Sequence, residues 1–268
     1  MPIVNARMYS ATAEAKADWH RVLGWALQRA DLDWEIVDHD APAPLAQLWA
    51  RKDLGAAMMC GLPFAKRRPR PTLIAAPVPS LPRYGGEPVY CTDIVVATDS
   101  LHASIEDTFG GVVGYTLADS MSGAVAFLDH LLPLRAKRGT RLYGAAVGGL
   151  INARGVIDAL AEGRIDIGPL DSYSHDLLKQ YHPVLAARVR TIESTALRPI
   201  PPLVATAAIG ADALARLRDA LLHARDAGEL AAPMARLHLA GFAVPDPSRY
   251  DALAAIADAS AAVTFEDL

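Results

Sequence analysis

The sequence predicts an α/β protein of two lobes with a hinged cleft. Apolar segments of strand character alternate with segments of helical periodicity, which is typical of mixed, mostly parallel sheets flanked by helices. Two extended stretches, near residues 95–99 and 194–199, interrupt this alternation and indicate two passages between lobes. We therefore expect residues 1–95 and 199–268 to form the first lobe and residues 96–198 to form the second.

The composition excludes several classes of protein. Of the 268 residues, 52% are hydrophobic, which is enough for a sizeable core. The net charge of −4 gives no electrostatic case for a nucleic-acid partner, and no apolar run reaches the ~18 residues that span a membrane. Cys60 and Cys91 form neither a disulfide framework nor a metal pattern, so we expect two buried thiols, with a single bridge as the alternative.

The N-terminal residues indicate a first strand rather than a signal peptide, because no basic region is followed by a long apolar one. The chain as written is therefore expected in the cytoplasm, or in the periplasm if an export signal has been removed.

The first lobe shows the alternation most clearly. Expected strands cover residues 3–8, 34–37, 55–60 and 72–76, and expected helices cover residues 13–30 and 42–49. In parallel sheets, ligands bind beyond the carboxyl ends of the strands, which makes Tyr9, Ser10, Gly61 and Leu62 candidate binding residues. The basic run at residues 66–70 is interpreted as a solvated loop or as a patch that attracts anions.

Residues 89–98 are interpreted as a strand that crosses into the second lobe. Further strands are expected there at residues 112–115, 141–147, 165–170 and 189–192, and helices at 124–132, 153–162 and 172–180. The first of these helices should end near Pro133, and Gly163 should close the second. After the prolines at 199–202, a strand (203–206), a helix (212–227), a loop (240–242) and a last helix (250–257) are expected.

The most informative stretch is the turn from Thr116 to Ala124, which we call the serine turn. Ser120 and Ser122 fall where a strand passes into a helix N-terminus, where unpaired N–H groups and the macrodipole favour an anion. Serine supplies O–H donors, and Gly123 allows the backbone to come close. The alternative is that Asp119 or Ser120 only caps the helix.

Catalytic patterns are missing from the sequence. The eight histidines include no pair at His-x-x-x-His spacing, and the Gly-x-Ser-x-Gly, phosphate-loop and dinucleotide fingerprints do not occur. We therefore expect no catalytic residue, no metal and no cofactor. His175 follows Asp171 by four residues, so the two could pair in a cleft or make a surface contact.

At five places the sequence resembles the phosphate/phosphonate-type substrate-binding proteins of ABC transporters, which have the type II periplasmic binding protein fold. The resemblance covers about residues 3 to 207, and its most specific parts are the serine turn and the segment from Ala159 to Asp171. The five places are Met8-Tyr9, Cys60 to Phe64, Tyr90, Asp119 to Gly123, and Ala159 to Asp171.

The resemblance implies roles for these residues. In that family a Ser-x-Ser-Gly turn grips phosphoryl or phosphonyl oxygens, which would place Ser120, Met121, Ser122 and Gly123 on the ligand. Aromatic side chains line the cleft of the family, which indicates Tyr9 and Tyr90.

Two further roles follow from the same resemblance. Asp171 corresponds to an acidic residue that faces an amino group in aminophosphonate binders. The family commonly has a histidine where this chain has residues 147–154. Either Asn152 or Arg154 takes over its contact, or the ligand is a different one.

The function that these observations predict is capture of a small oxyanion or organic anion, phosphate- or phosphonate-like, in the cleft between the lobes. The expected protein partner is an ABC permease. The alternative is a cytoplasmic enzyme or ligand sensor on the same fold that acts on a small anionic metabolite.

Overall fold

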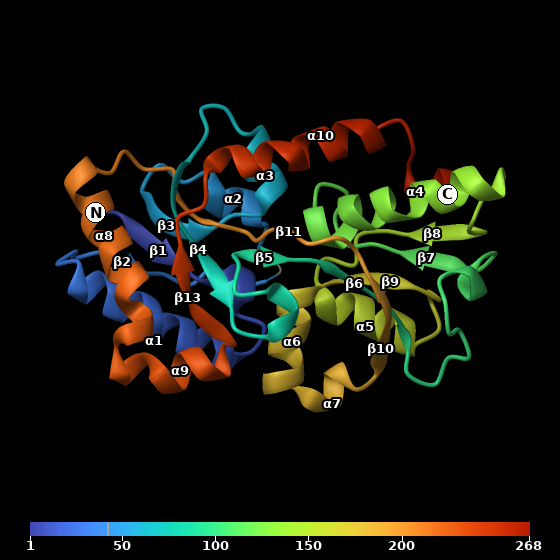
Figure 1. Cartoon of the computed structure of the whole chain (residues 1–268), viewed down its shortest axis with the longest axis horizontal. Helices are drawn as coiled ribbons and strands as arrows, with labels where there is room; N and C mark the ends of the chain where they lie inside the picture. The colour runs from blue at the N-terminus through green and yellow to red at the C-terminus, as the bar shows by residue number, and fades with distance from the viewer. Residues whose placement is uncertain (42) are drawn as a thin grey trace. The chain divides into compact units, whose positions relative to one another are not determined.

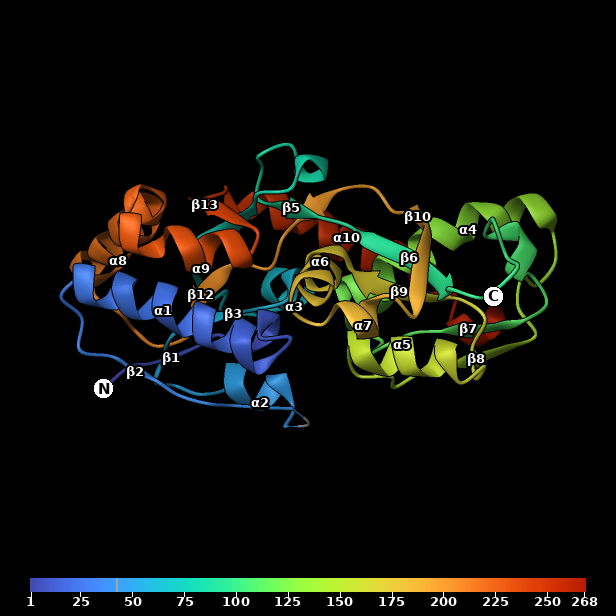
Figure 2. The same cartoon turned by 90° about the horizontal axis from the view of Figure 1, so that it is seen from below.

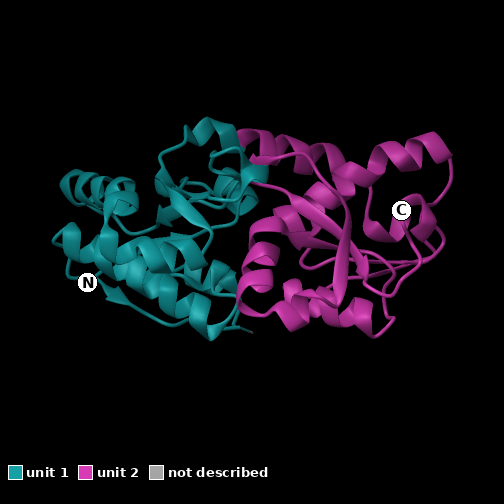
Figure 3. Cartoon of the chain, turned by 60° about the horizontal axis from the view of Figure 1, so that its bottom comes forward, with its two compact units in different colours: residues 1–89, 199–250 teal, residues 90–198, 251–268 magenta. Residues whose placement is uncertain are grey.

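The computed structural model describes residues 1–41 and 43–268. They form two compact units, drawn in two colours in Figure 3. Unit 1 comprises residues 1–89 and 199–250, and unit 2 comprises residues 90–198 and 251–268.

The C-terminal residues differ from the division expected from the sequence, which placed residues 199–268 together. Helix α10 (Asp251–Ser260) and the residues after it cluster with unit 2, so the chain passes between the units three times. Phe265 stacks on Tyr115 with ring centroids 4.3 Å apart, and Leu268 is fully buried in the same apolar cluster. An apolar helix face shows that a helix must pack, but it does not specify against which lobe.

Unit 1 is built on a six-stranded mixed sheet (Figure 1). Its strands are β1 (Ile3–Asn5), β2 (Glu35–Ile36), β3 (Leu54–Met58), β4 (Thr72–Pro79), β12 (Leu203–Ala205) and β13 (Leu239–Ala243). The spatial order is β13-β4-β12-β3-β1-β2. β1 pairs in parallel with β2 and β3, whereas β12 runs antiparallel between β3 and β4.

The helices of unit 1 are α1 (Ala13–Arg29), α2 (Leu45–Trp49), α3 (Gly61–Lys66), α8 (Ala211–His223) and α9 (Ala231–Arg236). Helix α1 begins where the sequence predicts, because the Thr12 side chain accepts a hydrogen bond from Ala15 N at 3.2 Å. Pro42, the expected start of the second helix, lies outside the described residues. Helix α1 contacts both α8 and α9, and α8 and α9 also contact β13.

Strand β13 replaces the loop that was expected at residues 240–242. Alanine and glycine have weak strand propensity, so the local sequence gives little signal. Pairing with β4 decides the conformation, with a register shift between Leu239 and Gly241. Phe242 packs edge-on against Trp19 of α1, with ring centroids 6.4 Å apart. Tertiary packing therefore overrides the turn chemistry here.

Unit 2 contains the strands β6 (Thr92–Ala97), β7 (Val112–Gly114), β8 (Ala145–Val147), β9 (Gly168–Asp171) and β10 (Val189–Ser194). β6 pairs antiparallel with both β10 and β9 (Figure 2). β7 and β8 pair in parallel, and a parallel bridge joins Val113 to Ile167, directly before β9. The linking segments β5 (Val89–Tyr90) and β11 (Arg198–Pro199) form a small sheet of their own.

The helices of unit 2 are α4 (Ala126–Arg138), α5 (Ala153–Ala161), α6 (Ser172–Tyr181) and α7 (Pro183–Ala186). The expected end near Pro133 is wrong, because α4 continues past the proline and stops at Gly139, whose φ is +73°. Phe127 and Leu131 are fully buried in the core of unit 2, which holds the helix together despite the lost backbone hydrogen bond.

None of the described helices is both long enough and apolar enough to cross a membrane.

Candidate functional site

Three chain segments leave the same edge of the sheet in unit 2. β7 and β8 run in parallel, and the chain entering β9 runs in parallel with β7, so their carboxyl ends share one edge. The segments after these ends lead into the short π-helical turn Met121–Val125, into α5 and into α6. Three helix N-termini therefore lie along this edge of the sheet.

Ser120 caps the first of these N-termini. Its Oγ accepts a hydrogen bond from Gly123 N at 3.1 Å, and its carbonyl accepts from both Ala124 N and Val125 N at 3.1 and 3.0 Å. The wide turn lets the chain pass directly into α4. The predicted passage from strand to helix at Ser120 is thus what the structure shows, and Ser120 does cap this helix.

Gly123 fits this turn because no larger residue does. An added Cβ would collide with Thr116 Oγ1 and lie 2.9 Å from Thr116 Cβ. Thr116 N also donates to Gly123 O at 2.9 Å. The start of the serine turn and its end are therefore tied together, which fixes the backbone of Met121 and Ser122.

Ser122 and Asp171 are brought together, although 49 residues separate them. Ser122 is buried, and its Oγ donates to Asp171 Oδ2 at 3.3 Å. Asp171 Oδ1 accepts from Ser174 N at 2.9 Å and so caps α6. Burial raises the pKa of the Asp171 carboxyl to about 6, against the lowering effect of these hydrogen bonds.

Asn152 caps the third N-terminus. Its Oδ1 accepts from Gly155 N, the third residue of α5, at 3.1 Å. The loop before it is tied to the serine turn, since Gly149 N donates to Thr116 O at 2.8 Å and Leu150 N to Tyr115 O at 3.3 Å. Arg154 lies exposed in the first turn of α5, where the macrodipole makes a cation unfavourable unless an anion is near.

The predicted site residues of unit 1 follow two neighbouring parallel strands, β1 and β3. Tyr9 is buried in a short 3₁₀ turn, and Ser10 Oγ donates to Ala6 O at 2.8 Å. Gly61 and Leu62, expected beyond the end of a strand, form the buried first turn of α3. Tyr90 is buried in β5 and belongs to unit 2.

A family model described as "ABC transporter, phosphonate, periplasmic substrate-binding protein" matches residues 27–250. The chain belongs to this family. Its role is therefore solute binding, as the sequence predicts, and members of the family bind a small ligand for a permease. A search of curated proteins found no match.

Solved structures share the fold of this family member. The binding protein component of an ABC phosphonate transporter from Pseudomonas aeruginosa has a TM-score of 0.79 and 16% identity, covering 97% of this chain and 87% of its own. PhnD1 from Prochlorococcus marinus, in complex with methylphosphonate, has a TM-score of 0.75 and 14% identity, covering 98% of each chain. The predicted fold class is thereby confirmed.

The His175 and Asp171 side chains do not form the pair that the sequence suggested. His175 Nδ1 lies 2.9 Å from Asp93 Oδ2 instead, and Ser194 Oγ donates to Asp93 Oδ1 at 2.8 Å. Asp93 and His175 are both fully buried. Sequence reasoning missed this pair because 82 residues separate its members and no local motif joins them.

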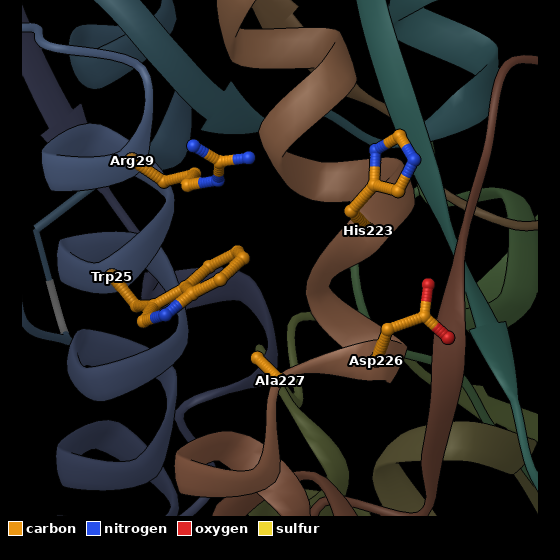
Figure 4. A pocket seen from close by; sticks show the side chains of 5 residues that line it. All are labelled: Trp25, Arg29, His223, Asp226 and Ala227. Atoms are coloured by element: carbon orange, nitrogen blue, oxygen red, sulfur yellow. The ribbon is translucent and has the colours of Figure 1, made fainter.

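A pocket of about 290 Å³ lies elsewhere, in unit 1 (Figure 4). Trp25 and Arg29 reach it from α1, and His223, Asp226 and Ala227 line its other side. No predicted site residue contributes to it. Over the described residues, no group of His, Cys, Asp and Glu could hold a metal ion.

Proposed function

We propose that this substrate-binding protein holds the phosphonyl group of a small phosphonate at the three helix N-termini of unit 2. The observation that carries the proposal is the meeting of Ser120, Ser122 and Asp171 at one strand-end edge, with Asn152 on the adjoining loop. N–H groups and hydroxyls at helix N-termini are suited to an oxyanion. The family supports the ligand class and delivery to an ABC permease in the periplasm.

Within this proposal Met121 supplies a backbone N–H group, and Asp171 acts on the ligand through Ser122. Gly123, whose own N–H donates to Ser120 Oγ, lets the backbone come close to the ligand. Both carboxylate oxygens of Asp171 already accept hydrogen bonds, from Ser174 N and Ser122 Oγ. This arrangement favours orientation of the serine hydroxyl over a direct contact with an amino group. We also propose that Tyr9, Ser10, Gly61, Leu62 and Tyr90 contribute contacts to the ligand.

The test is calorimetric titration of the wild type and of a Ser120→Ala/Ser122→Ala variant with methylphosphonate, phosphite, phosphate and sulfate. We expect the wild type to bind methylphosphonate. The double variant should lose roughly 2–3 kcal/mol of binding free energy, because two hydroxyl contacts to a charged group disappear.

Thr12→Ala is the matched control, since it removes the N-cap of helix α1, which belongs to unit 1. Both variants should lose about 1 kcal/mol of stability through the lost cap, but only the double variant should lose affinity. Equal affinities of the double variant and the wild type for methylphosphonate would overturn the proposed site.

A further inference from the structure

Two large apolar side chains stand exposed beside the serine turn. Leu117 is 46% exposed and Ile151 is 52% exposed. Exposed apolar residues are common on protein surfaces when they occur singly. Here two of them lie on the two loops that leave neighbouring strands, β7 and β8, at the edge where the three helices begin.

Backbone hydrogen bonds fix the position of both residues against the proposed anion site. Ser120 N donates to Leu117 O at 2.9 Å, so Leu117 begins the tight turn that ends at Ser120. Ile151 directly precedes Asn152, on the loop that Gly149 N ties to Thr116 O at 2.8 Å. The two apolar residues therefore lie on adjoining loops, one of which leads directly into Ser120.

The backbone of Ile151 has an unusual conformation. Its φ is +65°, and Asn152 N donates to Leu150 O at 2.7 Å across it, so Ile151 is the centre of a γ-turn with positive φ. This turn is rare and strained, and a β-branched side chain fits it worst. Asp31 and His238 share a positive φ, but they are residue types that tolerate it.

Folding alone would be served better by glycine or asparagine at position 151. A strained residue that keeps its apolar side chain exposed beside a binding turn indicates a contact with something other than the protein itself. The organic group of a phosphonate is attached directly to the phosphorus. When the phosphonyl oxygens are held by the serine turn, this group therefore lies close to the residues that adjoin the turn.

We propose that Ile151 and Leu117 form an apolar wall that selects phosphonates carrying an alkyl chain over those carrying a single methyl or an amino group. This inference rests on the proposed function, because it takes the serine turn as the phosphonyl site. Each methylene placed against the wall adds to affinity, whereas an ammonium group there loses its hydration without a partner.

The test is titration of the wild type, Ile151→Gly and Ile151→Val with methylphosphonate, n-butylphosphonate and aminoethylphosphonate. We expect the wild type to prefer n-butylphosphonate over methylphosphonate by about tenfold, because three methylenes are partly buried. Ile151→Gly should lose this preference and melt at a higher temperature. Ile151→Val should keep the preference.

Asp31→Gly is the matched control, since it relieves a positive φ at the end of α1 and should leave all affinities unchanged. Wild type that binds methylphosphonate and n-butylphosphonate equally, or that prefers aminoethylphosphonate, would overturn the apolar wall while leaving the phosphonyl site intact. Wild type that binds none of the three would overturn the proposed function itself.

Discussion

The carboxyl of Asp171 controls which way the proton of Ser122 points. An ionised Asp171 accepts a hydrogen bond from the Ser122 hydroxyl, and the Ser122 oxygen then offers the ligand only lone pairs. A protonated Asp171 can donate to Ser122 instead, which frees the serine hydroxyl to donate to a phosphonyl oxygen. Because burial raises the pKa of Asp171 to about 6, both states are accessible near neutral pH.

We expect the affinity for methylphosphonate to rise as the pH falls from 7.5 to 5.5. The sign follows from the raised pKa of Asp171, because an anion binds better when the neighbouring carboxyl is neutral. Over this range the gain in affinity of Asp171→Asn should be smaller than that of the wild type by a factor of about five to ten, because only the titration of the ligand remains. Calorimetry at several pH values gives the comparison, and parallel pH profiles for the two proteins would contradict this role.

Residues of this site differ in how far the sequence reveals them. Ser120, Asn152 and Asp171 all cap helices at strand ends, but local cap chemistry singled out only Ser120, whereas the family resemblance indicated Asn152 and Asp171. The contact between Ser122 and Asp171 depends on the pairing of distant strands, and so does the buried Asp93–His175 pair. The strained φ of Ile151 has no sequence signal at all, because isoleucine is a poor choice for it.

At the scale of elements, the prediction failed where packing outweighs local propensity. The order of strands and helices follows from apolar periodicity, which survives in most segments. Periodicity does not predict strand β13, which contains residues of weak strand propensity, or the second half of helix α4, which contains a proline. In both, buried partners compensate for the unfavourable local sequence, and such partners cannot be read from a window of the chain.

Helix α4 supplies a direct test of this compensation. Pro133 is exposed inside α4 and cannot donate to the carbonyl of Asp129, so Pro133→Ala restores a backbone hydrogen bond. We expect the free energy of unfolding to rise by roughly 1–2 kcal/mol, less than the full cost of a helix-interior proline because alanine also frees the unfolded chain. Urea unfolding measures the change. A less stable variant would show that the proline fits its place in α4 better than a regular helix does.

At the scale of the whole molecule, the family resemblance carried more information than any local pattern. The alternation of strands and helices indicates an α/β protein, and the resemblance adds the two-lobed fold that the solved structures share. The assignment of residues 251–268 was beyond both arguments, since the resemblance stops near residue 207.

The C-terminal residues contribute to the core of unit 2. Phe265 is buried between Tyr115 and Phe127, and the Leu142 N–H donates to the carbonyl of Leu268. We expect Phe265→Ala to lower the free energy of unfolding by about 3 kcal/mol, as for other large core residues. Leu101→Ala, at a 97% exposed position of the same unit, should change it by less than about 0.5 kcal/mol.

Binding gives this variant a second readout. Tyr115, on which Phe265 stacks, accepts through its carbonyl the hydrogen bond from Leu150 N that ties the Ile151 loop to the serine turn. Loosening of the C-terminal residues should therefore weaken methylphosphonate binding as well as folding. A Phe265→Ala protein with wild-type stability in urea would show that residues 261–268 lie outside the core of unit 2.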